Sequence, residues 1–122
     1  MRLSKKRINK TVELQLYNLF YQVIADLRST TEAKAFLEGI LSKTELEALV
    51  KRLGVARLLD QGQSYEEIKK MLKVSSATVA TIAEQMKKEK GFEVALKKIR
   101  AHQWAGKWAK KISQIINPKA NK

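Results

Sequence analysis

The chain has 122 residues, of which 44% are hydrophobic, and its formal net charge is +13. Its length predicts one main folded domain, and its lack of cysteine and single histidine, His102, exclude a disulfide scaffold and a thiolate or histidine metal site. The excess of lysine and arginine favours a polyanionic partner.

The positive charge is unevenly placed along the sequence. Residues 1–10 carry five bases and no acid, residues 11–60 carry six bases against seven acids, and residues 73–122 carry twelve bases against three acids. We expect residues 1–10 to form a flexible basic arm that either contacts phosphates or is simply solvated. No apolar run is long enough to span a bilayer, and none follows the basic N-terminus as in a signal peptide, so a cytoplasmic protein is expected.

The first predicted helix covers residues 11–27 and is apolar on two sides. One stripe is Val12, Leu16, Leu19, Val23 and Leu27, and the other is Leu14, Tyr17, Tyr21 and Ile24. A helix of this kind is too apolar for the surface of a small monomer. We therefore expect it to be buried against a partner, in a homodimer.

Three Ser-x-x-Glu capping boxes predict further helix starts, at Ser29, Ser42 and Ser64. The helix that begins at Ser29 would end near Leu41. The helix that begins at Ser42 would end near Gln61, where Gly62 supplies a left-handed backbone. The residues of the helix that begins at Ser42 expected to face inward are Leu46, Leu49, Val50, Leu53 and Leu58. An all-α domain over residues 11–100 follows from this pattern.

Residues 64–88 are predicted to form two short helices joined by a tight turn. Ile68 and Leu72 share one face of the first, Ser75 caps the second, and Val79 and Ile82 begin its apolar side. This is the layout of a helix-turn-helix, whose second helix enters the major groove of DNA. An ordinary helical hairpin in a bundle is the alternative, and this stretch alone favours neither.

Residues 101–122 are predicted to form a basic amphipathic C-terminal helix or tail. Its apolar stripe includes Trp104 and Trp108 and is flanked by Lys107, Lys110 and Lys111. Three roles fit this composition: covering the core of a dimer, binding a partner or a membrane surface, or adding phosphate contacts. The second role defines an alternative function, non-specific binding of RNA or of a membrane surface.

Residues 41–82, LSKTELEALVKRLGVARLLDQGQSYEEIKKMLKVSSATVATI, resemble the Trp repressor superfamily, specifically its Trp-repressor-like branch. The shared motifs are S-x-x-E-L-E-A-L with R-L three residues later, a helix ending in L-L-x-x-G, an E-I-K-x-x-L helix and S-x-A-T-V. The resemblance implies an intertwined all-α homodimer that presents two DNA-reading heads to a palindromic operator. A repressor-like transcription regulator would act in this way on double-stranded DNA.

The resemblance also indicates which residues would contact DNA. Lys69 matches a DNA-contacting lysine and Ala77 a base-facing alanine, whereas Glu66 replaces an arginine and Lys73 replaces the glycine of the turn. The residues expected to neutralise phosphates are Lys69, Lys70, Lys73, Lys87, Lys88 and Lys90. Those expected to read the groove are Ser75, Ser76, Ala77, Thr78, Ala80 and Thr81, and several differ from Trp repressor, so a different operator is expected.

The corepressor pocket implied by the resemblance is only partly retained. Ser42 matches a threonine that lines the pocket, and Arg52 matches one of two arginines that enclose the indole. Thr81 replaces the second arginine, and Ile82 stands where the pocket needs glycine. We expect a vestigial effector pocket at Ser42, Arg52 and Thr81 that does not bind tryptophan, and any other small-molecule effector is unknown.

The usual arrangements of an enzyme are missing from the sequence. It has no clustered carboxylates, catalytic histidine pair, glycine-rich phosphate loop or nucleophile motif. We therefore expect a binding protein rather than an enzyme, with no metal and no cofactor.

Overall fold

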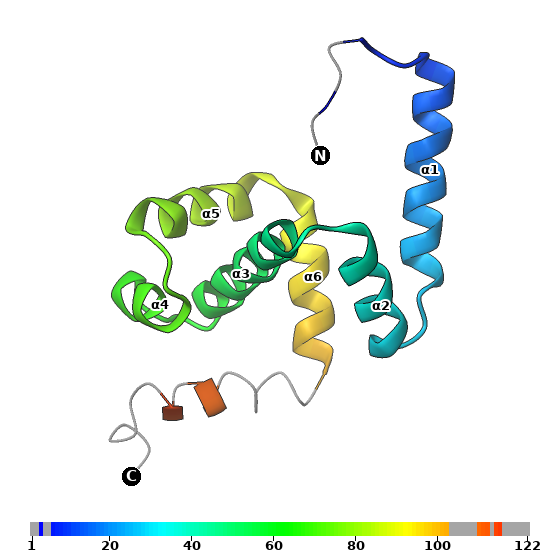
Figure 1. Cartoon of the computed structure of the whole chain (residues 1–122). Coiled ribbons are helices and arrows are strands. Elements are labelled where there is room, and N and C mark those ends of the chain that lie inside the picture. The colour runs from blue at the N-terminus through cyan, green and yellow to red at the C-terminus, as the bar shows by residue number, and fades with distance from the viewer. Residues whose placement is uncertain (1–2, 4–5, 103–109, 113, 116–122) are drawn as a thin grey trace. The chain divides into compact units, whose positions relative to one another are not determined.

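The computed structural model describes residues 3, 6–102, 110–112 and 114–115, and its helices follow one another along the chain (Figure 1). They are α1 (Lys10–Asp26), α2 (Thr30–Ile40), α3 (Lys43–Asp60), α4 (Tyr65–Leu72), α5 (Ser76–Lys88) and α6 (Lys90–Ala101). The all-α prediction is confirmed. The C-terminal tryptophans, Trp104 and Trp108, lie outside the described residues, so the role of the tail stays a prediction.

Side-chain caps begin three of these helices at the predicted positions. The hydroxyl oxygens of Ser29, Ser42 and Ser64 accept hydrogen bonds from the backbone N–H groups three residues later, at 3.0, 3.1 and 3.2 Å. At α3 the box is complete, because the Ser42 N–H donates to the Glu45 carboxylate at 2.8 Å. These bonds from Ser42 lower the pKa of Glu45.

The chain divides into two compact units, residues 1–46 and 47–122. In the N-terminal unit, α1 and α2 contain no buried residue. Phe20 of α1 and Phe36 of α2 stack with their ring centroids 6.1 Å apart. The exposed large apolar residues of α1 are Val12, Leu14, Leu16, Tyr17, Leu19, Phe20, Tyr21, Val23 and Ile24. Most of the apolar surface of α1 is therefore left uncovered within the N-terminal unit.

The C-terminal unit has a hydrophobic core of its own. Its fully or almost fully buried residues are Val55, Ala56, Leu58, Ile68, Val79, Ile82 and Leu96. They come from α3, α4, α5 and α6, so the two helices of the predicted helix-turn-helix pack on the second half of α3. This packing fixes the orientation of α5.

The predicted inward face of α3 is only partly correct. Leu58 is buried and Leu46 is half-buried, but Leu49, Val50 and Leu53 are exposed by 45%, 61% and 41%. Helical spacing identified a shared apolar face, but it could not show that only the second half of that face meets α4 and α5.

An ion-pair network joins the ends of α3 and α6. The Arg100 guanidinium donates to both carboxylate oxygens of Asp60, and it also donates to Glu93 at 3.3 Å. Arg57 lies 3.4 Å from the same Asp60 carboxylate. The hydrogen bond from Arg100 lowers the pKa of Asp60. The network fastens α6 to the end of α3, which in turn supports α4 and α5.

Candidate nucleic-acid interface

The connection between α4 and α5 is a tight turn held by local hydrogen bonds. Lys73 ends α4 in the left-handed conformation, with φ 54° and ψ 50°, and its N–H donates to the Lys69 carbonyl oxygen at 2.9 Å. Ser75 then caps α5, because its hydroxyl oxygen accepts from the Thr78 N–H at 3.1 Å. The lysine that replaces the turn glycine thus adopts the left-handed conformation itself.

The two faces of α5 differ sharply in burial. Val79 and Ile82 are 0% and 4% exposed and pack in the core of the C-terminal unit. The exposed residues at the start of α5 and its cap are Ser75, Ser76, Ala77, Thr78, Ala80 and Thr81. All of these side chains are small, so another molecule can come close to the backbone of the helix. The structure thus places every residue predicted to read the groove on the exposed surface at the start of α5.

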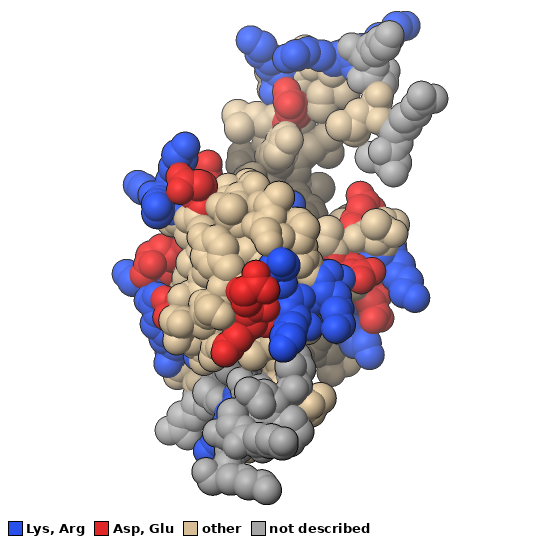
Figure 2. Space-filling model, turned by 90° about the vertical axis from the view of Figure 1, so that its left-hand side faces the viewer, with Lys and Arg blue, Asp and Glu red and all other residues tan. Residues whose placement is uncertain are grey.

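The surface around the start of α5 is uncharged at its centre. Figure 2 views the molecule from the side on which α4 and the start of α5 lie: an uncharged area is bordered by both basic and acidic side chains. This arrangement suits a surface that contacts base edges centrally and phosphates at its margin.

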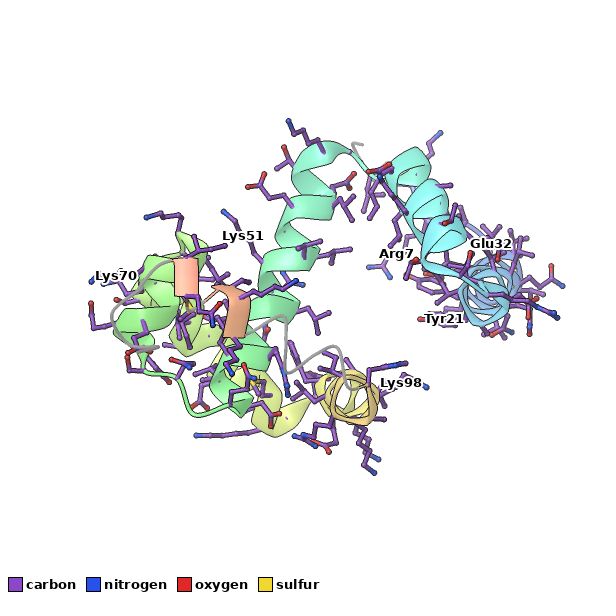
Figure 3. The ribbon with its side chains drawn as sticks, turned by 90° about the horizontal axis from the view of Figure 1, so that it is seen from below. Arg7, Tyr21, Glu32, Lys51, Lys70 and Lys98 are labelled. Carbon is purple, nitrogen blue, oxygen red and sulfur yellow. The ribbon has the colours of Figure 1, made fainter. Side chains whose placement is uncertain are left out.

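The predicted phosphate contacts do not all carry a free positive charge. Lys69 lies 3.5 Å from the Glu66 carboxylate and Lys87 lies 3.3 Å from Glu84, each pair within one helix. Lys70, Lys73 and Lys88 are exposed, and Lys70 projects outward from α4 (Figure 3). Glu66 therefore reduces the local field at Lys69, the residue singled out by the resemblance.

A pocket of about 290 Å³ lies between α3 and α5 and is called here the α3–α5 pocket. Its lining residues are Arg52, Ala77, Thr78, Thr81, Ile82 and Gln85. Two of the residues expected in a vestigial effector pocket, Arg52 and Thr81, thus line one pocket. Ser42 is not among its lining residues and belongs to the N-terminal unit. Thr78 and Gln85 also line the pocket, and no motif or spacing in the sequence indicated this role.

A second, more apolar hollow of about 340 Å³ lies between α3 and the start of α6. It is lined by Leu49, Arg52, Leu53, Glu89, Gly91, Phe92 and Ala95. The exposed leucines of α3 therefore face a hollow that α6 covers only in part.

A family model described as Trp repressor protein matches residues 15–100 of the chain. The chain belongs to the Trp repressor family. A relative in Bacillus subtilis (strain 168), the uncharacterized protein YerC, is 29% identical over 76 residues, which cover 62% of this chain and 72% of the relative. No solved structure matches the chain significantly.

The Trp repressor family is a family of DNA-binding transcription regulators rather than of enzymes. Membership favours the helix-turn-helix over an ordinary helical hairpin for residues 64–88. None of the helices in the described part of the chain is long and apolar enough to cross a membrane. Within those same residues, no group of three histidine or acidic side chains could hold a metal ion.

Proposed function

We propose that this member of the Trp repressor family binds specific sites on double-stranded DNA as a homodimer and is a repressor-like regulator of transcription. The observation that carries the proposal is the contrast between the two faces of α5. Val79 and Ile82 anchor the helix in the core, while small side chains cover its exposed side. A helix fixed in this way can enter the major groove without rearrangement.

Base recognition would rest on short polar side chains. Hydroxyl groups of Ser75, Ser76, Thr78 and Thr81 can exchange hydrogen bonds with base edges directly or through water, and Ala77 and Ala80 suit thymine methyl groups. The exposed start of α5 carries no arginine or lysine. Sequence discrimination would therefore be modest at each base pair and would depend also on DNA shape.

Affinity would come chiefly from the lysines at the margin of this surface. Lys69, Lys70 and Lys73 lie on α4 and in the turn, and Lys87 and Lys88 lie at the end of α5. Each phosphate that they neutralise releases counterions, so binding should weaken steeply as salt is raised.

The homodimer is supported by the uncovered apolar surface of α1. A single helix-turn-helix makes few contacts with DNA, whereas two related by a two-fold axis contact half-sites about 34 Å apart. Pairing through α1 would bury side chains that the isolated chain leaves in water. In this proposal tryptophan is not the corepressor, because Ile82 fills the position of a pocket glycine and Thr81 removes one of the two enclosing arginines.

The decisive experiment is selection of bound DNA from a pool of random duplexes. A palindromic consensus is the expected result, and the absence of any enrichment would overturn sequence-specific binding. On random duplex, Lys69→Ala should weaken binding to every sequence, whereas Thr78→Ala should barely change it. Equal losses for both variants would contradict the assignment of phosphate and base contacts.

A further inference from the structure

We infer that the α3–α5 pocket receives a backbone phosphate of the bound duplex, held by Arg52, and that DNA binding consequently needs no small effector in this pocket. This inference rests on the proposed function, because it names a partner for a pocket on the flank of the proposed recognition helix. It adds to the DNA contacts a residue of α3, outside the helix-turn-helix.

The chemistry of the pocket is that of an anion site. Arg52 supplies a guanidinium, Thr81 supplies a hydroxyl and Gln85 supplies an amide, while the Thr78 hydroxyl is already hydrogen-bonded to the Ser75 hydroxyl at 2.9 Å. No carboxylate is among the lining residues. A guanidinium with neighbouring hydroxyl and amide donors matches the oxygen atoms of a phosphate, and arginine is the side chain best shaped to bind one.

Arg52 is available for such a ligand. It is exposed, and it makes no ion pair with any other residue that the structure describes. Glu89 lines the neighbouring hollow together with Arg52, but the two side chains form no ion pair. A guanidinium without an ionic partner can form charge-assisted hydrogen bonds with a phosphate in place of water.

The position of the pocket points to DNA rather than to a free molecule. All lining residues except Arg52 belong to α5, and Thr78 and Thr81 are also on its exposed face. A helix in the major groove has a phosphate strand along each flank, so a cation beside that helix meets the backbone. Arg52 is thereby placed next to the strand that borders α5.

The pocket is poorly suited to hold a planar aromatic effector. Ile82, which lines the pocket with a branched side chain, is 4% exposed. Only one lining residue, Arg52, has a flat cationic group that could cover a ring, because Thr81 replaces the second. A tetrahedral phosphate needs no such enclosure, since it is bound through its oxygen atoms at the mouth.

The test compares Arg52→Gln with Lys51→Gln in the full-length protein, using random-sequence duplex at salt concentrations between about 50 and 200 mM. Lys51, labelled in Figure 3, is the matched control: it precedes Arg52 on α3, and its replacement removes the same charge. Its ammonium group is paired with the Glu47 carboxylate at 3.3 Å. Circular dichroism and thermal melting of each variant establish that it is folded.

Log affinity falls as log salt rises, and we expect Arg52→Gln to make this slope less steep by about 0.9, the value of one phosphate contact. Binding at about 0.1 M salt should become roughly eightfold weaker. Arg52→Lys should restore most of the slope, and Lys51→Gln should leave it unchanged. A wild-type slope in Arg52→Gln, or an equal change in Lys51→Gln, would overturn the inference. Absence of duplex binding by the wild-type protein would instead overturn the proposed function.

A second arm identifies the source of the phosphate. Millimolar inorganic phosphate or L-tryptophan, added at matched ionic strength, should leave the duplex affinity of the wild-type protein unchanged. An increase in affinity that disappears in Arg52→Gln would show that the pocket takes a free effector, and the inference would be wrong.

Discussion

Helix α1 and helix α5 both carry apolar stripes, but they use them in opposite ways. Val79 and Ile82 of α5 are buried against α3 and α4, whereas every large apolar side chain of α1 is at least 37% exposed. Full burial of one such side chain is worth about 1.5–3 kcal/mol. The apolar residues of α5 therefore contribute this energy within the C-terminal unit, while those of α1 contribute little of it within the N-terminal unit.

The polar residues of α1 make the same point. Thr11, Gln15, Asn18 and Gln22 recur at spacings of four, three and four, so they form one narrow strip of the helix. The remaining circumference is largely apolar. A helix that lies on the surface of one domain usually has one apolar stripe and is polar over the rest of its circumference.

The largest effect should come from a charge in the core of the C-terminal unit. Val79→Asp places a carboxylate at a fully buried position, which should cost more than about 4 kcal/mol and unfold this unit. Ala80→Asp, at the adjacent exposed position, should change stability by less than about 0.5 kcal/mol while weakening DNA binding by repulsion. Thermal melting followed by circular dichroism measures the stability of both variants. Similar melting points for Val79→Asp and Ala80→Asp would contradict the burial of Val79.

The next effect concerns α1 and should leave the C-terminal unit folded. Leu16→Asp introduces a charge on the apolar side of α1 and should convert the proposed dimer to monomers, weakening DNA binding by at least an order of magnitude because the two heads are no longer linked. Gln15→Asp, on the polar strip, is the control. Sedimentation equilibrium gives the mass of each variant, and a dimer that survives Leu16→Asp would exclude α1 as the interface.

A smaller effect is expected in the turn of the helix-turn-helix. Lysine pays a steric cost of about 1 kcal/mol in the left-handed conformation that glycine avoids. Lys73→Gly should therefore raise the melting temperature by a few degrees, although the more flexible unfolded chain offsets part of the gain. Gly62→Ala should have the opposite effect and lower the melting temperature, because Gly62 has φ 82°, a conformation that is unfavourable for alanine. A fall in melting temperature for Lys73→Gly would contradict the strain.

The smallest effect is a dependence on pH at the junction of α3 and α6. The pKa of Asp60 is lower in the folded chain than in the unfolded chain, mainly because of its hydrogen bond from Arg100. The resulting stability is present above the unfolded pKa of about 4 and is lost as pH falls through the folded pKa. Arg100→Gln should thus melt below the wild type at pH near 7, and the gap should narrow below pH near 4. An equal gap at both pH values would exclude this linkage.

Local features of the fold were predictable because their causes are local. The helix expected over residues 11–27 is observed as Lys10–Asp26, and the boxes at Ser29, Ser42 and Ser64 all cap helices. A capping box needs only residues three positions apart. The buried and exposed faces of α5 were likewise given by helical spacing around Val79 and Ile82.

Features that depend on distant parts of the chain were not predictable. Arg100 and Asp60 are 40 residues apart, and no spacing rule connects them. Val55 and Ala56 are fully buried, while Leu49 and Leu53 are not, because coverage depends on where α4 and α5 fold back. The Glu66–Lys69 pair, by contrast, could have been found from its spacing of three on a helix.

A single residue, Glu89, separates α5 from α6. Only its two soft backbone torsions can take up a change in angle between these helices, so displacement of α6 is transmitted to α5 instead of being lost in a loop. A force on the far end of α6 would therefore act on α5 as well, and the ion pair between Arg100 and Asp60, which joins α6 to α3, would oppose such a displacement.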